Sequence, residues 1–194
     1  MTHRLDDAAL DLLFRSARSI HTFVPGPLDD ATLESLYDLL KWGPTAFNSL
    51  PARFVFVRSP QAKARLAPTL SPSNRDKTLA APVTAIVAYD SRFYDRLPED
   101  NPKVRDIYAD NADLAQSTAF RNGTLQGAYL LLAARALGLA AGPMSGFDAA
   151  AVNREFFPDG RHQVNFLVNL GYPNGTVPRP RGPRFGFADV VTVL

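Results

Sequence analysis

The sequence predicts a single α+β domain, on the strength of three observations. The chain has 194 residues with 46% hydrophobic content, which is enough for one sizeable core. Apolar, β-forming runs at 54–57, 83–89 and 164–172 predict strands. Helical periodicity separates these runs, and over 114–139 it is so rich in apolar residues that we expect a buried core helix. We therefore expect one domain that spans residues 1–194.

Two amphipathic helices are predicted before the first strand. Asp6 or Asp7 can cap a first helix that ends within 16–19. Asp29 or Asp30 can cap a second helix, whose apolar residues follow the i, i+3, i+4, i+7 pattern.

Residues 42–58 (WGPTAFNSLPARFVFVR) lead from the end of the second helix into the first strand. Pro44 cannot continue a helix, because it has no N–H and clashes with the preceding turn. Thr45, Asn48 and Ser49 supply hydroxyl and amide donors. Such a turn can wrap a polar, planar ligand, although an ordinary helix–strand connection fits the same residues.

The middle of the chain predicts two short helices and two polar stretches. Ser59 begins a helix that continues through Leu66, and residues 71–77 form a polar patch in which Asn74 can cap a turn. Residues 91–113 are charged and irregular, with a short helix around 104–108. So long an excursion is functional or mobile, and we interpret it as a substrate cover or a solvated loop.

Past the long helix, glycines and a capping residue mark the boundaries. Gly138 and Gly142 end the helix, and residues 143–147 form a turn. Asp148 caps the helix that follows. The last eight residues, 187–194, form a short helix or an extended piece, after a Pro- and Arg-rich tail over 178–184.

The composition excludes several classes of function. A net charge of +2 and the lack of a basic run with interleaved aromatics give no support for nucleic-acid binding. The absence of cysteine excludes disulfides, thiolate metal sites and a Cys nucleophile. No apolar run is long enough to span a membrane and no signal peptide is recognisable, so we expect a cytoplasmic protein without membrane contact.

No motif for metal, phosphate-loop or nucleophilic chemistry is present. The three histidines lack metal-ligand spacing, and there is no GxSxG, GxxxxGK[ST] or GxGxxG. This pattern favours chemistry that a cofactor supplies, with the protein contributing position and charge. Four separated segments carry donors or cations at the edges of secondary elements, although each alone fits a helix cap, a turn or a solvated side chain. They are Arg18/Ser19, Thr45/Asn48, Asn74/Lys77 and Arg181/Arg184.

Together with residues 142–148 (GPMSGFD), these segments resemble the nitroreductase-type FMN oxidoreductases over nearly the whole chain. The resemblance implies a nitroreductase-like fold: a central mixed, mainly antiparallel sheet flanked by helices, in an intertwined homodimer with shared FMN sites. It also implies NADH or NADPH as electron donor, a small-molecule substrate and no metal. The implied cofactor-binding residues are Arg18, Ser19, His21, Pro44, Thr45, Ala46, Asn48, Asn74, Lys77, Pro143, Met144, Ser145, Gly146, Arg181 and Arg184.

Within that family the chain looks like the malonic semialdehyde reductase branch, which reduces 3-oxopropanoate in pyrimidine breakdown. The segments KWGPT, SPxN, KTLxAPVTAIVA, TAFRN and GPMSGFD carry this resemblance. A broad nitro- or quinone reductase, a non-catalytic flavin-binding protein and a cofactor-free subunit are the alternatives. The chain departs from the family pattern at His21, Leu50, Ser145 and Gly182, which concerns FMN affinity.

The resemblance implies no certain catalytic side chain. Lys77 would tune the flavin electrostatically, because a cation beside the negatively charged edge of a reduced flavin favours reduction. Hydride from NAD(P)H and a second substrate arriving in turn would give ping-pong kinetics. Thr45 and Asn48 would reach the FMN of the partner subunit, which makes dimerisation a condition for function.

Overall fold

A computed structural model describes residues 3–97, 102–176 and 180–194. Its centre is a four-stranded sheet in the order β1-β2-β4-β3, in which every neighbouring pair is antiparallel. An isolated parallel bridge joins Ser19 to Ala141 at the β3 edge. The strands are β1 (Ala52–Val57), β2 (Val83–Asp90), β3 (Ala140–Met144) and β4 (His162–Gly171). The expected antiparallel sheet and all three expected strands are confirmed.

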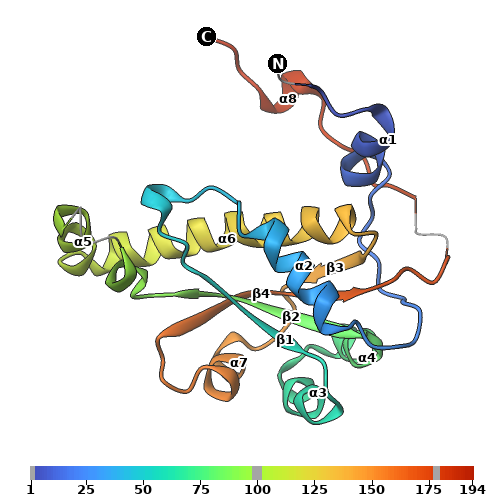
Figure 1. The fold of residues 1–194 in the computed structure, drawn as a ribbon, viewed down its shortest axis with the longest axis horizontal. Coiled ribbons are helices and arrows are strands. Elements are labelled where there is room, and N and C mark those ends of the chain that lie inside the picture. The colour runs from blue at the N-terminus through green and yellow to red at the C-terminus, as the bar shows by residue number, and fades with distance from the viewer. Residues whose placement is uncertain (1–2, 98–101, 177–179) are drawn as a thin grey trace.

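Helices cover both faces of this sheet (Figure 1). The long helix α6 and helix α2 lie on one face, while α3, α4 and α7 lie on the other. The α-helices are α1 (Asp7–Leu10), α2 (Asp30–Leu40), α3 (Pro60–Leu66), α4 (Pro72–Ala80), α5 (Pro102–Ala109), α6 (Ala112–Ala136), α7 (Ala149–Phe156) and α8 (Phe187–Val190). A π-helical turn η1 (Asp11–Arg15) and 3-10 turns η2 (Ala46–Asn48), η3 (Ala67–Thr69) and η4 (Phe93–Arg96) complete the set.

The expected caps are present where local chemistry determines them. Asp6 accepts a hydrogen bond from Ala9 N, Asp29 from Thr32 N and Asp148 from Ala151 N. These side chains satisfy N–H groups that a helix start leaves without partners.

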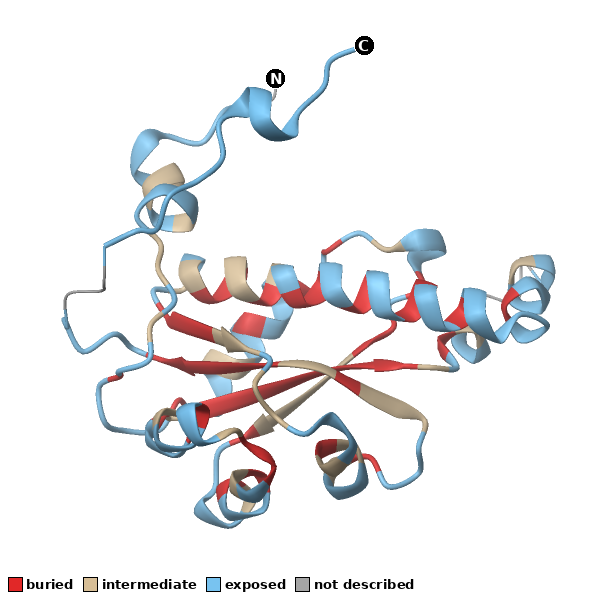
Figure 2. Ribbon diagram, turned by 180° about the vertical axis from the view of Figure 1, so that it is seen from behind, coloured by how far each residue is buried: buried red, intermediate tan, exposed pale blue. Residues whose placement is uncertain are grey.

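Strand β2 is the centre of the core, and all of its residues are buried. Val83, Ala85 and Val87 pack under α2 and α6, whereas Ile86 and Ala88 pack against α3 and α7. This alternation follows from the two-residue period of a strand and produces one apolar layer on each face. Figure 2 shows the two buried layers on either side of the sheet.

The buried face of α6 differs from the expected one. Leu125 is 45% exposed and Phe120 50% exposed, although the sequence predicts a helix buried nearly all round. Small residues face the sheet instead: a Cβ at Gly127 would come within 2.5 Å of Phe166 Cζ, and one at Gly123 within 3.0 Å of Tyr89 Cβ. The glycine-containing face of α6 therefore packs on the sheet, because small residues let the helix approach closely, and the bulky apolar face points away from the sheet.

The structure contains one helix that was not predicted, and it differs from two local predictions. The polar patch 71–77 belongs to helix α4, where Pro72 occupies the first turn, a position that needs no N–H. The short helix expected around 104–108 is confirmed within α5, but the other described residues of 91–113 are also mostly helical rather than irregular, in η4 and the start of α6, and residues 98–101 lie outside the described part. Pro143 and Met144 continue β3 rather than forming a turn, as does Gly142.

The two ends of the chain form arms that extend beyond the sheet layers (Figure 1). Phe14, Phe185 and Phe187 are 52%, 82% and 69% exposed on these arms. Of the predicted tail, residues 178 and 179 lie outside the described residues. The closing segment is helix α8 followed by an extended end. No helix among the described residues has the length and apolarity needed to cross a membrane.

Candidate functional site

The N-terminal arm ends in a turn whose carbonyls accept hydrogen bonds from two of the expected arginines. Arg18 donates to Ser16 O at 3.1 Å and to Ala17 O at 3.0 Å. Arg181, from the far end of the sequence, donates to Arg15 O at 2.6 Å and to Ala17 O at 2.8 Å. The structure therefore brings Arg18 and Arg181 together on one turn.

Four arginines make this region strongly positive. Loss of surrounding water, followed by the charges of Arg18, Arg184 and Arg135, lowers the pKa of Arg181. Within the described residues, none of the four pairs with a carboxylate. Such a cluster is suited to an anion such as a phosphate, which would offset the mutual repulsion.

Arg135, in the last turn of α6, was not among the residues predicted from the sequence. Its guanidinium donates to Leu13 O at 2.8 Å, and its buried Nε has no partner. It lines a cavity of about 220 Å³ together with Arg18. A cation near the C-terminus of a long apolar helix was the only sequence signal, and the helix dipole alone accounts for it.

His21 and Lys77 are close enough to influence each other. Burial, and then the charge of Lys77, lowers the pKa of His21, so its imidazole is neutral at pH 7. A Cβ at Gly142 would lie 3.0 Å from His21 Nδ1. His21 is therefore set between β3 and α4 as a neutral group, and it cannot replace the charge of an arginine at neutral pH.

Asn74 joins α4 to the turn after β3. Its Nδ2 donates to Gly146 O at 2.8 Å, and Ser71 N donates to the same oxygen at 3.1 Å. A Cβ at Gly146 would come within 2.5 Å of Asn74 Nδ2 and 2.7 Å of Ser71 Oγ, so a side chain there would have to displace these two groups. Asn74, Gly146 and the neighbouring Ser145 and Met144 therefore form one wall.

The turn after α2 is strained. Phe47, Asn48 and Leu50 have φ values of 52°, 51° and 43°, in the left-handed region that non-glycine residues rarely adopt. Thr45 Oγ1 accepts a hydrogen bond from Leu50 N at 3.1 Å. Phe47 is 61% exposed. A strained backbone that the surrounding structure maintains, with side chains exposed to solvent, is typical of functional turns.

Two buried polar residues of α6 support this turn from beneath. Asn122 Oδ1 accepts from Ala46 N and Gln126 Oε1 accepts from Ala52 N, both at 2.9 Å. Neither residue was predicted to support the turn, although two amide side chains four positions apart in an apolar helix are a usable signal.

The strained turn and the arginine cluster lie at different places along α6. The turn contacts Asn122, whereas the cluster includes Arg135, and 13 residues of helix at 1.5 Å each separate these positions by ~20 Å. Of the expected site residues, Arg18, Arg181 and Arg184 form one group, and His21, Asn74, Lys77 and Gly146 a neighbouring one. Pro44, Thr45, Ala46 and Asn48 lie apart from both.

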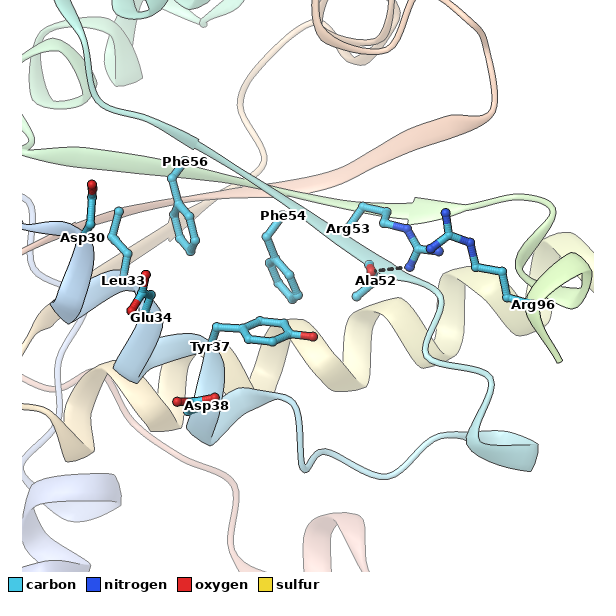
Figure 3. Close-up of a pocket in the computed structure, with 10 residues that line it drawn as sticks. All are labelled: Asp30, Leu33, Glu34, Tyr37, Asp38, Ala52, Arg53, Phe54, Phe56 and Arg96. Atoms are coloured by element: carbon cyan, nitrogen blue, oxygen red, sulfur yellow. Dashed lines mark hydrogen bonds between the residues drawn. The ribbon is translucent and has the colours of Figure 1, made fainter. Parts of the chain in front are cut away.

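Another cavity lies elsewhere, between α2 and the edge strand β1. Its volume is about 770 Å³, and Figure 3 shows Phe54 and Phe56 along its floor, with Arg53 and Arg96 side by side at one end. None of the expected cofactor-binding residues lines it. Asn48 lines a separate cavity of about 250 Å³.

The donor set fits an elongated anionic cofactor rather than a metal. Among the described residues, no group of three or more His, Asp or Glu side chains could hold a metal ion. Unpaired arginines suit a phosphate, and a backbone turn with glycine suits close approach of a flat ring. The fold and these groups define an α+β domain built to hold a phosphate-bearing cofactor.

The chain belongs to the nitroreductase family, whose family model matches residues 14–172. A Rhodopseudomonas palustris protein with the provisional name NADH dehydrogenase/NAD(P)H nitroreductase is 53% identical over 196 residues, with both chains fully covered. A Burkholderia lata protein of the same description is 55% identical, covering 97% of this chain and 98% of its own. A structure from Exiguobacterium sibiricum, solved in complex with FMN, superposes with a TM-score of 0.86 at 18% identity, covering 100% of each chain.

Proteins of this family are oxidoreductases that use FMN, with NAD(P)H as electron donor. The expected enzyme class, fold and cofactor are therefore confirmed. The expected branch within the family, the roles of individual residues and the dimer stay predictions.

Proposed function

We propose that this protein transfers hydride from NAD(P)H to a small substrate by a ping-pong reaction, with each FMN held between two copies of the chain. The observation that carries the proposal is the separation of the predicted site into two parts. The arginine cluster and the neighbouring group with Lys77 and Asn74 form one part, and the strained turn at 45–50 forms the other; along α6, the turn and the cluster are ~20 Å apart. A second copy of the chain can bring these parts together.

Exposed apolar side chains support the dimer. Trp42 is 76% exposed and Phe47 61% exposed beside the strained turn, and the outward face of α6 adds Phe120 and Leu125. The apolar arms at both ends of the chain add to this surface. Apolar surface on this scale marks an interaction site in a natural protein.

FMN, when bound, supplies the chemistry of accepting and donating hydride. The chain binds and orients it. Arg18, Arg181 and Arg184 would hold the phosphate through charge-assisted hydrogen bonds. Lys77 would place a positive charge at the ring edge that becomes negative on reduction. Asn74 holds the backbone of the Ser145–Gly146 turn, so a main-chain N–H there can face the ring without a particular side chain.

A visible spectrum tests the proposal first. The purified protein should be yellow, and NAD(P)H should bleach it in the absence of oxygen. Bound FMN that NAD(P)H does not bleach would favour a non-catalytic flavin-binding protein. Protein that stays colourless after reconstitution with FMN would contradict the proposal and favour a cofactor-free subunit.

Two substrate classes compete. The segments KWGPT and GPMSGFD favour malonic semialdehyde (3-oxopropanoate), whereas the names of the curated relatives favour nitro compounds. Specific rates on 3-oxopropanoate, a nitroaromatic and a quinone, each with NADH and with NADPH, separate them. A kcat/KM for 3-oxopropanoate that does not exceed that for the other acceptors would reject the malonic semialdehyde assignment.

A further inference from the structure

Lys63 is a buried lysine that the proposed chemistry does not use. It projects from α3 and is only 6% exposed. Its Nζ donates to Thr78 O at 2.6 Å, to Ala81 O at 2.7 Å and to Thr84 Oγ1 at 3.1 Å. An ammonium has three N–H donors, and these three acceptors satisfy all of them.

Two of these acceptors are carbonyls at the C-terminal end of α4. A helix end normally satisfies its last carbonyls with backbone N–H groups of the following residues. Here Ala81 is the C-cap, and the next residue is Pro82, which has no N–H. The Lys63 ammonium takes the place of this missing donor, and its charge matches the negative end of the helix dipole.

The third acceptor begins a buried polar chain under α4. Thr84 Oγ1 donates to Asn169 Oδ1 at 2.8 Å, and Asn169 Nδ2 donates to Thr78 Oγ1 at 3.1 Å. Thr78 Oγ1 donates to Met144 Sδ at 3.5 Å. Every hydrogen in the chain points away from the ammonium, so each bond polarises the next in the same direction.

This arrangement fixes α4 at its end and along its buried side. Lys77 directly precedes Thr78, and Asn74 lies one turn earlier on the same helix. Met144, where the polar chain ends, directly precedes the Ser145–Gly146 turn that Asn74 holds. The groups proposed to face the flavin therefore lie on segments that the Lys63 network joins.

We propose that Lys63 is a positioning residue for the flavin site: its buried ammonium holds the C-terminal end of α4 and thereby the placement of Lys77 and Asn74. The inference rests on the proposed function. Lys63 does not touch the flavin itself and acts through α4. Burial lowers the pKa of Lys63 to about 8, which leaves the ammonium as the main form at pH 7.

Lys63→Met tests the inference, because methionine keeps much of the side-chain volume and removes the donor. Gln61→Met, on an exposed position of the same helix, is the matched control. We expect the FMN dissociation constant of K63M to rise about tenfold, and the midpoint potential of the bound flavin to fall. Q61M should match the wild type in both.

Combining K63M with a Lys77 substitution shows whether Lys63 acts by positioning Lys77 or only by a general loss of structure. If Lys63 acts through Lys77, K63M should shift the potential in the wild-type background but not in a Lys77→Ala background. An equal shift in both backgrounds, or wild-type affinity and potential in K63M, would overturn the inference.

Two further measurements keep the test decisive. If K63M does not fold, Thr84→Val is the second variant, because it removes one acceptor of the Lys63 ammonium at nearly constant side-chain shape. We expect it to raise the FMN dissociation constant and lower the midpoint potential, as in K63M. Wild-type affinity and potential in T84V would count against the inference. Hydrogen exchange of residues 78–83 needs no FMN, and K63M should accelerate it. Wild-type protein that binds no FMN rejects the proposed function, whereas unchanged exchange in K63M rejects the capping role.

Discussion

At the scale of single residues, the arginine cluster carries a definite expectation. Arg18 has no carboxylate partner among the described residues and donates only to main-chain carbonyls of its own turn. It is therefore available to a phosphate. Arg18→Ala should weaken FMN binding about 10- to 100-fold, the cost of removing a hydrogen bond to a charged group. Quenching of FMN fluorescence on titration with protein measures this.

The control for Arg18→Ala is Arg105→Ala, an exposed arginine of α5. Since charge dominates the contact, the difference between the two variants should shrink as salt is raised. Equal affinity of both variants at low salt would remove Arg18 from the phosphate site.

At the scale of elements, the strained turn depends on α6. Asn122 is buried, and its side chain accepts from Ala46 N while donating to Thr118 O. Asn122→Leu leaves the Ala46 N–H without its partner, which should destabilise the fold by about 1–3 kcal/mol. Urea unfolding measures the change, with Arg121→Leu on the neighbouring exposed position as control. A variant as stable as the control would show that the turn keeps its conformation without this support.

The end of β2 carries a buried ion cluster with a predictable pH dependence. Asp90 is fully buried and bonds to Arg161 at 2.8 Å and 2.9 Å and to Arg53 at 3.0 Å. Burial raises the pKa of Asp90, but the hydrogen bonds and charges of Arg161 and Arg53, with a bond from Arg92 N, outweigh it and lower the pKa overall. The native state therefore favours the carboxylate.

The stability from Asp90 is fully present above the ordinary Asp pKa of ~3.9 and is lost as pH falls through the lower native value. Asp90→Asn should cost about 3 kcal/mol at pH 7, because Arg53 and Arg161 lose a partner while partly exposed. Unfolding free energies from pH 7 to 2 should converge for wild type and variant at the acid end. Asp38→Asn, on an exposed position of α2, should be near neutral throughout.

At the scale of the whole molecule, the sequence was sufficient where structure is local. The strands around β2, the caps Asp29 and Asp148, and the extent of α6 all follow from short-range pattern. The buried face of α6 does not, because it depends on how closely Gly123 and Gly127 let the helix approach the sheet. The helix at 72–80 was missed because its buried polar residues pair with distant partners such as Asn169.

The same distinction applies to the site. Candidate residues were recognisable by a resemblance that spans the chain, but their grouping was not. Arg18 meets Arg181, 163 positions away, only through a turn that folds back on itself. Supporting residues such as Gln126 and Lys63 have no motif, since a buried amide or ammonium acquires its role only from the partners that the fold supplies.

If each FMN site is shared between two chains, dimers that combine two different variants should behave differently from dimers of either variant alone. Lys77 belongs to one part of the proposed site and Asn48 to the other. Lys77→Ala and Asn48→Ala proteins should each have low activity as homodimers. A mixed dimer contains one K77A chain and one N48A chain. If each site takes Lys77 from one chain and Asn48 from the other, one site contains both substitutions and the other site is wild type. Half of the dimers in an equal mixture are of this kind, so activity should recover to about a quarter of wild type.

Unfolding the two variants together and refolding them with FMN allows subunits to exchange. Each variant refolded alone is the control, and differently tagged copies allow the mixed dimer to be isolated and its FMN content measured. If each FMN were held by one chain, every site would carry a lesion and mixing would restore nothing. Recovery specific to the mixed dimer therefore requires that Lys77 of one copy and Asn48 of the other serve the same flavin.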